Sequence, residues 1–167
     1  MRLFIAINFS EEMKTALKDI QRQMKEQNVR GNFTKPENLH LTLAFIGEYN
    51  DIDRVTDALG KAEFKPFSLS LKGLGSFGRL WWAGIGDSGE LKKLAAQVRH
   101  HLADSGIPFD KKKFSPHITL IREPNKADIP ELTVPAAEMT VESISLMLSE
   151  RGRNGMIYTE IGSVECG

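Results

Sequence analysis

Two histidines of the chain, His40 and His117, occur in the same four-residue pattern, His-x-Thr-Leu. In each copy a threonine, Thr42 or Thr119, stands two residues after the histidine. Side chains two residues apart on a strand share one face and lie about 6.5 Å apart, because a strand rises ~3.3 Å per residue. One copy alone is typical of an ordinary half-exposed strand. Two copies that face each other would form a single site with two imidazoles and two hydroxyls.

That set of groups suits an in-line reaction at phosphorus. Attack by water or a hydroxyl needs a base on one side of the phosphorus, and expulsion of the leaving oxygen needs an acid on the other. Histidine has an ordinary pKa of about 6.5, so one neutral and one protonated imidazole coexist near neutrality. Threonine hydroxyls donate hydrogen bonds to the non-bridging oxygens. We therefore predict catalysis by His40 and His117 and substrate binding by Thr42 and Thr119, with acid and base unassigned.

Other reactive side chains are weaker candidates. A zinc site needs three or four ligands, and the two motif histidines have no third ligand at a suitable spacing, so we expect no metal and no other cofactor. Cys166 is the only cysteine and closes no disulfide within the chain, which is typical of a reducing compartment. The adjacent His100 and His101 fall in a predicted helix and are interpreted as ordinary helix residues.

Basic and aromatic residues near the motifs are candidates for contacting a nucleotide. Arg122 follows the second motif and is expected to reach a phosphate or a base, although a surface charge fits its position equally well. Trp81 and Trp82 point to opposite faces of one strand, so one belongs to the core and the other is available to stack on a base. The remaining candidates are Phe33, Lys111, Lys112, Lys113, Arg151 and Arg153.

The sequence patterns place both motifs on strands. Residues 3–8 are apolar enough for a buried strand, and a period of two predicts further strands over 39–45, 67–71, 80–84, 114–121, 144–148 and 156–161. Three helices are predicted to begin after the capping residues Ser10, Asp51 and Ser88. The glycines after residue 71 are expected to end the strand over 67–71, and Asn154-Gly155 predicts a hairpin turn.

The period of two also predicts which side of each motif strand faces the core. In the first strand the odd-numbered residues 39–45 are apolar and are expected in the core, Phe45 included. In the second strand Ile121 is expected on the polar face with His117 and Thr119. Because the opposite faces supply the apolar residues, the polar faces are expected to line a cleft.

A faint duplication relates the two motifs. Strand, capped helix, proline-containing loop and His-x-Thr-Leu strand occur twice, with 35 residues from Ile5 to His40 and 35 from Trp82 to His117. A repeated βαβ-like unit predicts two lobes related by an approximate two-fold axis. Each lobe then presents one histidine and one threonine to the cleft.

The composition is that of a globular domain. The 167 residues include 22 Lys and Arg against 22 Asp and Glu, 41% are hydrophobic, and the sequence pI is near 6.9. This balance excludes a disordered chain and argues against a protein that coats duplex nucleic acid, because such binding rests on many cations. The apolar stretch near the N-terminus, about six residues, is too short for a signal sequence or a membrane span. We expect one domain over residues 1–167, monomeric, cytoplasmic and without membrane contact.

Taken together, these features resemble a known family. The chain is similar to the two-histidine phosphoesterase superfamily and, within it, to the RNA 2',3'-cyclic phosphodiesterases, also called 2'-5' RNA ligases. The resemblance spans nearly the whole chain and is carried by residues 2–7, 38–47, 73–77, 82–84, 114–122 and 148–150, with Gly155 and Tyr158. It implies an α+β fold of two pseudo-symmetric lobes, whose antiparallel or mixed sheets line a central cleft with helices packed outside.

The resemblance also implies an activity. Family members open a terminal ribose 2',3'-cyclic phosphate to a 2'-phosphate, and some join RNA ends through a 2'-5' linkage, so RNA termini or small nucleotides with a cyclic phosphate are the expected partners. His40 matches the proton donor to the departing 3'-oxygen, and His117 matches the acceptor that activates water. Thr42 and Thr119 match phosphate ligands. Arg122 falls where relatives often carry a basic residue, with no assigned role.

Two other functions are compatible with the same residues. One keeps the chemistry and changes the substrate to a 2',5'-linked oligonucleotide or a cyclic phosphate on an ADP-ribose derivative. The other is a non-catalytic module that binds RNA ends or nucleotides. Paired proton-transfer groups argue against pure binding, for which arginine is better suited.

Overall fold

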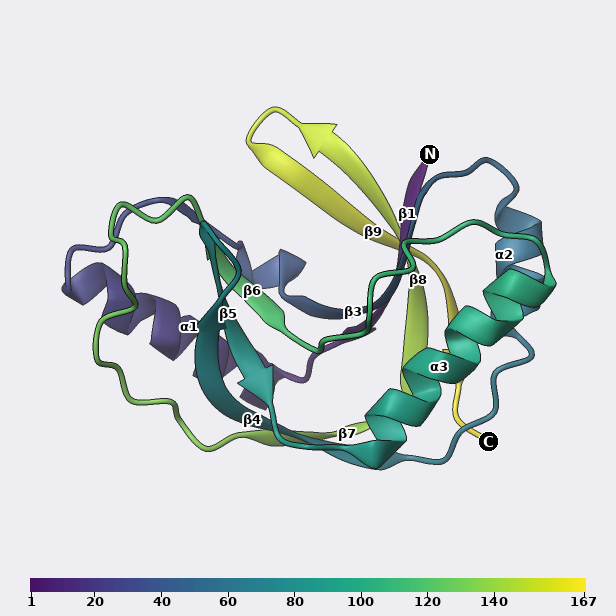
Figure 1. The fold of residues 1–167 in the computed structure, drawn as a ribbon, viewed down its shortest axis with the longest axis horizontal. Coiled ribbons are helices and arrows are strands. Elements are labelled where there is room, and N and C mark those ends of the chain that lie inside the picture. The colour runs from purple at the N-terminus through teal and green to yellow at the C-terminus, as the bar shows by residue number, and fades with distance from the viewer.

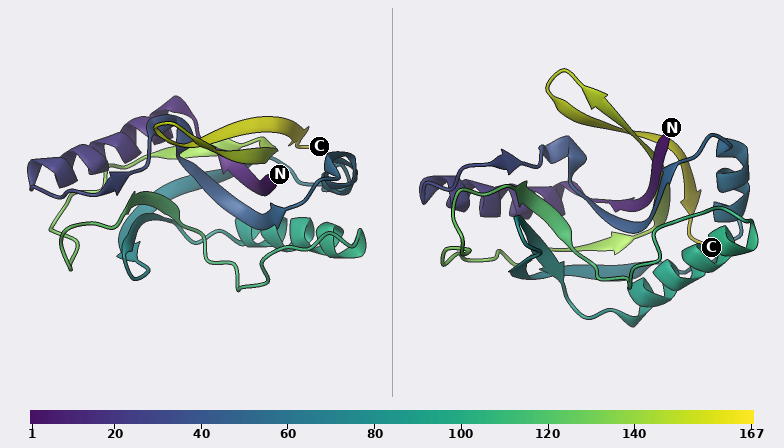
Figure 2. Two further views of the ribbon diagram at one scale, coloured as in Figure 1. Left: turned by 90° about the horizontal axis from the view of Figure 1, so that it is seen from above. Right: turned by 45° about the horizontal axis from the view of Figure 1, so that its top comes forward.

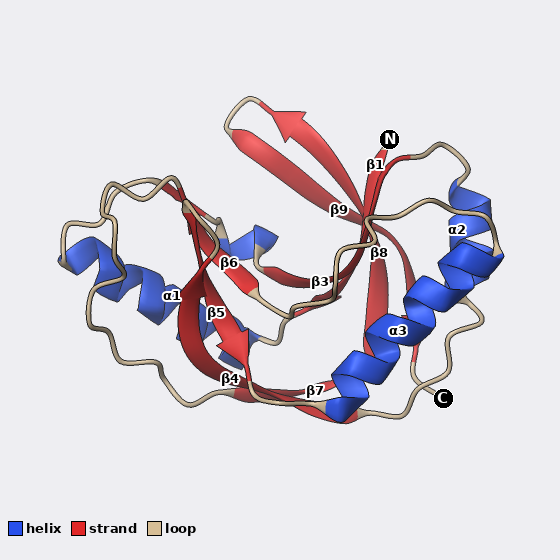
Figure 3. Cartoon of the chain, viewed as in Figure 1, coloured by secondary structure: helices blue, strands red, loops and turns tan.

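The computed structural model describes residues 1–167, with three α-helices, one short 3-10 helix and two sheets (Figures 1 and 3). The helices are α1 (Glu11–Glu26), η1 (Pro36–Asn38), α2 (Ile52–Leu59) and α3 (Gly89–Asp104). The strands are β1 (Arg2–Asn8), β2 (Asn32–Phe33), β3 (His40–Glu48), β4 (Phe67–Ser76), β5 (Leu80–Ile85), β6 (Ile118–Arg122), β7 (Glu138–Val141), β8 (Ser143–Gly152) and β9 (Gly155–Glu165). The predicted α+β class is confirmed.

Most of the predicted elements are present, although several strand bounds differ from the predicted ones. The glycines after residue 71 do not end β4, which continues to Ser76, because an irregularity in its pairing with β5 accommodates Gly73 in a left-handed conformation (φ 75°). The strand expected over 114–121 begins only at Ile118, so His117 immediately precedes β6. Two short strands, β2 and β7, were not predicted.

The three helices begin where the capping residues predict. The side chains of Ser10, Asp51 and Ser88 each accept a hydrogen bond from the backbone N–H three residues later. This bond satisfies an N–H group that has no partner within the helix, so the helix start is fixed locally.

The two sheets have corresponding strand orders, β3-β1-β8-β9 in the first and β6-β5-β4-β7 in the second, which β2 extends beyond β6. All pairings are antiparallel, so the repeat is not a βαβ unit: each motif strand pairs directly with the strand that precedes its helix. Thr42 lies opposite Ala6, and Thr119 lies opposite Trp82. Ala6 is therefore the counterpart of Trp82. The predicted equivalence of Ile5 and Trp82, which gave the equal spacing of 35 residues, is wrong by one residue.

Each long helix packs against the sheet of the other half. The helix α1 follows β1 of the first sheet but lies against β6 and β7 of the second. The helix α3 follows β5 of the second sheet but lies against β3 of the first, beside α2. Figure 1 and both views of Figure 2 show α1 and α3 at opposite ends of the molecule.

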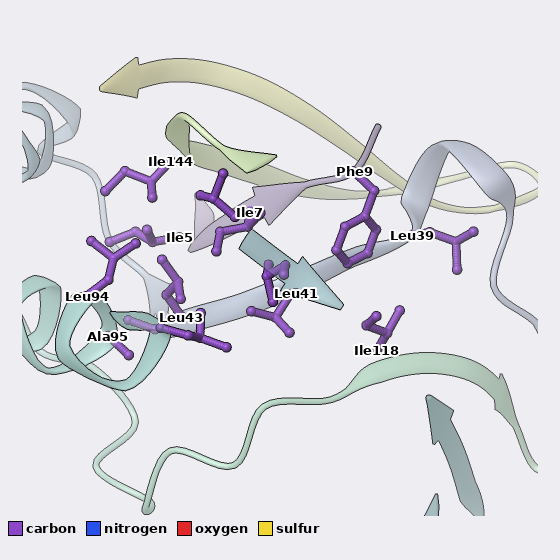
Figure 4. Packing of buried hydrophobic residues seen from close by; sticks show 14 of the residues in the cluster. Ile5, Ile7, Phe9, Leu39, Leu41, Leu43, Leu94, Ala95, Ile118 and Ile144 are labelled. Carbon is purple, nitrogen blue, oxygen red and sulfur yellow. The ribbon is translucent and has the colours of Figure 1, made fainter. Parts of the chain in front are cut away.

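One hydrophobic core joins the two halves. A cluster of 37 buried residues draws on both sheets and all three α-helices. Figure 4 shows its centre, where Leu41 and Leu43 of β3 lie near Ile118 of β6 and Leu94 of α3. Alternate residues of the motif strands fill this core, and their intervening residues are left to face outward from it.

The β8–β9 hairpin projects beyond the body of the molecule (Figures 1 and 2). Its strands pair up to Gly152 and Gly155, so the two turn residues are Arg153 and Asn154, and Gly155 takes a left-handed conformation (φ 110°). The predicted hairpin is confirmed with this adjustment of the turn. None of the helices combines the length and apolar character that crossing a bilayer requires.

Candidate active site

The two motif strands meet at the centre of the molecule. β3 forms one edge of the first sheet and approaches β6 of the second sheet. A cavity of about 400 Å³ lies at this junction, lined by His40, Thr42, His117, Thr119 and Arg122. The structure thus brings together the five side chains that the sequence analysis assigns to catalysis or expects at the phosphate.

The rest of the cavity wall is neutral or basic. It comprises residues of the first sheet and of the segment between β2 and β3, namely Arg2, Phe4, Thr34, Asn38, Phe45, Ser149, Met156 and Tyr158. No carboxylate lines the cavity, while Arg2 and Arg122 each bring a permanent positive charge. A cavity of this charge favours an anionic ligand.

Both motif histidines are oriented by the same backbone contact. Nδ1 of His40 lies 2.7 Å from the carbonyl oxygen of Asn38, and Nδ1 of His117 lies 2.8 Å from that of Ser115. A carbonyl only accepts hydrogen bonds, so Nδ1 carries the hydrogen in each ring. In the neutral imidazole Nε2 is then the basic nitrogen. For His40, Nε2 lies 2.9 Å from Oγ1 of Thr42 and accepts its hydroxyl hydrogen.

The two rings differ in their surroundings. The ring of His40 lies 4.8 Å from that of Phe4 and 5.3 Å from that of Tyr158, centroid to centroid. The ring of His117 is 5.0 Å from that of Phe77, which is 45% exposed. His40 is therefore held in an enclosed, largely aromatic wall, and His117 stands at a more open edge.

This enclosure changes the acid–base behaviour of His40. Burial lowers the pKa of its imidazole, because the charged form loses hydration. The hydrogen bond to the Asn38 carbonyl opposes this shift, whereas the positive charges of His117 and Arg122 lower the pKa further. His40 is consequently neutral near pH 7 as long as no anion occupies the cavity.

A β-bulge in each motif strand overturns part of the predicted face assignment. Thr42 and Ala44 pair with neighbouring residues of β1, so Leu43 is an extra residue in β3; in the same way Leu120 is extra in β6. A bulge reverses the alternation beyond it. Phe45, expected in the core, lines the cavity, and Ile121, expected on the polar face, is fully buried.

The comparisons with known proteins identify the family. A family model described as the 2'-5' RNA ligase superfamily matches residues 9–153. The chain belongs to this superfamily. It is 32% identical to the RNA 2',3'-cyclic phosphodiesterase of Thermotoga maritima, over 95% of this chain and 91% of that protein. It is 36% identical to the protein of the same name from Thermus thermophilus, over 95% and 87%.

Solved structures of E. coli LigT have the same fold as this chain. E. coli LigT in its apo form matches with a TM-score of 0.84 at 28% identity, covering 99% of this chain and 96% of that one. LigT complexed with 3'-AMP matches with a TM-score of 0.82, at the same identity and coverage. The resemblance inferred from the two motifs is therefore confirmed.

Several residues that the sequence singled out lie away from the cavity. Trp81 is 1% exposed and belongs to the core, while Phe33 lies under the ammonium group of Lys25 in a different surface depression. None of Lys111, Lys112, Lys113, Arg151, Arg153, His100, His101 and Cys166 lines the cavity. His100 instead contacts Asp104 through Nε2 at 3.2 Å. No group of three or more His, Cys, Asp or Glu side chains converges as a metal-ligand set.

Trp82 lies beside His117 but does not line the cavity. Its ring lies 6.4 Å from that of His117 and 5.2 Å from that of Phe77. It also covers Gly75, where any Cβ would collide with the indole. Trp82 is thus a support for the His117 edge, and glycine at 75 is required by its close approach.

Sequence reasoning missed several residues of the cavity wall. Arg2 lies with its guanidinium 5.3 Å from the Phe45 ring centre, and Tyr158 covers His40. Asn38, 8% exposed, donates from its side chain to the Met156 carbonyl at 2.9 Å and so fastens the β8–β9 hairpin beside the first motif. The only signal for these positions was the family resemblance, whose residues include Arg2, Phe4, Asn38, Phe45, Ser149 and Tyr158.

Proposed function

We propose that this protein is an RNA 2',3'-cyclic phosphodiesterase, which hydrolyses the cyclic phosphate at an RNA or nucleotide end to a 2'-phosphomonoester. One observation carries the proposal: both His-x-Thr motifs line the same cavity, whose only permanent charges are positive. Membership of the 2'-5' RNA ligase superfamily supports it, as do the relatives that bear this name.

In the proposed reaction, water attacks phosphorus on the side away from the 3'-oxygen. His117 accepts the proton of that water through Nε2, which is its basic nitrogen because Nδ1 is committed to the Ser115 carbonyl. The bond between phosphorus and the 3'-oxygen breaks, and His40 donates a proton from Nε2 to that oxygen. The new bond to water and the remaining bond to the 2'-oxygen leave a 2'-phosphate.

Two threonines and an arginine stabilise the charge that develops on phosphorus. Thr42 and Thr119 donate hydrogen bonds to the non-bridging oxygens, and Arg122 attracts the phosphate as a whole. In this structure the Thr42 hydroxyl is bonded to Nε2 of His40. Binding of the phosphate must therefore redirect this hydroxyl and free Nε2 to carry a proton.

The lowered pKa of His40 fits an acid only if the substrate supplies a compensating charge. A phosphodiester anion in the cavity favours the protonated imidazole and opposes the effects of burial, His117 and Arg122. We propose that His40 takes up its proton as the substrate binds. The enclosed aromatic wall then strengthens the pairing of imidazolium and phosphate, because it excludes water.

The decisive experiment is a product assay on RNA that ends in a 2',3'-cyclic phosphate. We expect a 2'-phosphomonoester, identified by its resistance to enzymes specific for 3'-phosphates and by NMR of a mononucleotide product. A 3'-phosphate product, or no turnover, contradicts the proposal. Turnover of 2',5'-linked oligonucleotides or of ADP-ribose cyclic phosphate with no turnover of RNA ends would select the alternative substrates, and tight binding without turnover would select the binding module.

The same geometry accommodates reversible 2'-5' ligation, in which an RNA 5'-hydroxyl replaces the attacking water. Including a 5'-hydroxyl RNA in the assay tests this extension directly. We also propose that no metal ion takes part, since the two imidazoles supply both proton transfers. Full activity in EDTA supports this, whereas loss of activity that a divalent ion restores contradicts it.

We further propose that the protein acts as a monomeric, cytoplasmic, single domain formed by residues 1–167. The shared core of both halves supports one domain, the zero net charge of one compact unit fits a monomer, and the single cysteine fits a reducing compartment. Sedimentation of the purified protein tests the monomer, and one cooperative unfolding transition is expected for the single domain.

A further inference from the structure

The bulges in the two motif strands leave carbonyl groups that need partners. Leu43 in β3 and Leu120 in β6 are the extra residues, and both side chains are fully buried. An extra residue in a bulge lies outside the regular ladder, so its polar backbone atoms must find other partners. In this protein, each of the two carbonyls accepts a hydrogen bond from a side chain of a long helix, and the Leu120 carbonyl also accepts one from the backbone N–H of Thr34 at 3.0 Å.

Gln21 of α1 serves the bulge of the second motif. Gln21 is 6% exposed, and its side-chain amide donates to the Leu120 carbonyl at 3.0 Å and to the Thr34 carbonyl at 2.9 Å. Thr34 lies in the segment that leads into the first motif and lines the cavity. One buried amide therefore links the approach to His40 with the strand that carries Thr119.

Arg99 of α3 serves the bulge of the first motif. Its Nε donates to the Leu43 carbonyl at 3.2 Å, and its Nη1 donates to the Lys112 carbonyl at 2.7 Å. Lys112 lies in the segment that leads into the second motif. Arg99 thus links the segment before His117 with the strand that carries Thr42. Gln21 makes the corresponding link in the other half, between the segment before His40 and the strand that carries Thr119.

The two side chains occupy equivalent places. Gln21 stands eleven residues after the capping Ser10, and Arg99 stands eleven residues after the capping Ser88. Each helix lies against the sheet of the opposite half, so each side chain reaches the opposite motif. An accidental pair of surface contacts would not repeat the helix position, the bulge carbonyl and the approach segment together.

We propose that Gln21 and Arg99 are positioning residues that hold the paired bulges of the motif strands, and so fix which side chains follow each threonine into the cavity. Beyond the bulges, Arg122 and Phe45 face the cavity while Ile121 and Ala44 fill the core. Loss of a bulge would reverse these faces. The effect on catalysis rests on the proposed function, whereas the effect on strand geometry does not.

The test is a crossed set of double mutants. Gln21→Met removes the amide that donates to both carbonyls at nearly constant shape, and Arg99→Met removes both donors of the second link together with the guanidinium charge. We expect each to raise KM for adenosine 2',3'-cyclic phosphate about tenfold, as expected for the loss of a charge-assisted or packing contact to the nucleotide. The Gln21 effect should vanish in an Arg122→Ala background and persist in Phe45→Ala, and the Arg99 effect should do the reverse.

Matched controls separate positioning from general loss of stability. Gln23 of α1 donates to the Thr133 carbonyl, and Gln97 of α3 donates to the Glu63 carbonyl, both outside the cavity wall. Gln23→Met and Gln97→Met remove similar bonds from the same helices. They are expected to lower Tm without changing KM.

Two further measurements keep the outcome decisive. A crystal structure of Gln21→Met should show regular pairing of β6 or a displaced Arg122, and this readout holds whether or not the wild type is a phosphodiesterase. If Gln21→Met does not fold, Gln21→Asn keeps an amide too short to reach both carbonyls. Unchanged bulges with unchanged KM, or purely additive double mutants, overturn the proposal; Arg99→Lys, which keeps one donor, should recover part of the affinity.

Discussion

The two halves of the cavity use the same backbone design and differ in what surrounds it. Each half has a His-x-Thr motif, a histidine held through Nδ1 by a carbonyl two residues earlier, and a bulge after the threonine. His40, however, sits against Phe4 and Tyr158, whereas His117 stands at an edge formed by Phe77 and Trp82. The two imidazoles are therefore chemically the same group, and only their surroundings make them behave differently.

The two halves also differ in the side chain that follows the bulge and faces the cavity. Phe45 in the first half and Arg122 in the second are equivalent in the strand pairing, and both line the cavity. A duplicated scaffold therefore presents an apolar ring on one side of the phosphate site and a cation on the other. Arg2, which lies over Phe45, adds a second cation to the apolar side.

Removal of either imidazole is expected to have the largest effect on activity. We expect His40→Ala and His117→Ala each to lower kcat by at least about 10³-fold, in the range for general acid–base catalysis. The double variant should be little worse than either single one, because acid and base act in one step. Initial rates on a 2',3'-cyclic nucleotide provide the measurement.

The control for these variants is His100→Ala, which removes an exposed histidine outside the cavity wall and should leave kcat unchanged. Circular dichroism must show the same fold for all four proteins. Full turnover by either motif variant would remove that histidine from the mechanism.

Substitution of the two threonines tests whether the two halves contribute equally to catalysis. Thr42→Val and Thr119→Val each remove one hydroxyl at constant shape, and we expect kcat to fall about 10²-fold for each, as for a single oxyanion donor. Because Thr42 alone is bonded to a histidine, only Thr42→Val should also change the pH dependence of the rate. Equal pH profiles for both variants would show that this bond has no part in catalysis.

The residues after the bulges are expected to have smaller and different effects. Arg122→Ala should raise KM about tenfold or more, and this effect should shrink at high salt, because it arises from charge. Phe45→Ala should raise KM less, with little dependence on salt, because it removes apolar contact. Steady-state kinetics at low and high ionic strength distinguish the two. The reverse salt dependence would mean that the halves do not divide the phosphate and nucleoside contacts in this way.

The smallest expected effect concerns the pKa of His40. The folded state holds this pKa below the ordinary histidine value, so the unfolded chain binds the proton first as pH falls. The free energy of unfolding should therefore decrease as pH falls from about 6.5 through the folded pKa of His40, and be unaffected by this residue at higher pH. Urea titrations of wild type and His40→Gln over this range provide the comparison.

The same pKa predicts proton uptake when a phosphate-bearing nucleotide binds. Calorimetry near pH 6.5 in buffers of different ionisation enthalpy should show net uptake for the wild type and a smaller value for His40→Gln. NMR titration of the His40 ring without ligand should give a pKa below the ordinary value. A pKa above that value would mean that burial does not control the protonation of this ring.

Much of this architecture follows from local patterns in the sequence. Caps such as Ser10 and Ser88 act through neighbouring backbone groups, so helix starts are visible without tertiary information. The paired motifs and the family resemblance are likewise enough to place His40 and His117 in one site.

What the sequence did not reveal depends on contacts between distant segments. The bulges at Leu43 and Leu120 are stabilised by side chains from the other half, so strict alternation misplaced Phe45 and Ile121. The continuation of β4 past its glycines depends on pairing with β5. Arg2 joins the cavity only because β1 lies beside β3, a pairing that no single segment encodes.

The packing of each helix on the opposite sheet limits how the chain can be divided. A break in the loop between α2 and β4 would separate α1 from the sheet that it covers and β1 from β8, its partner in the first sheet. Neither fragment would bury its own apolar surface. We expect such fragments to be unstructured alone and to regain structure only when they are mixed and complement each other.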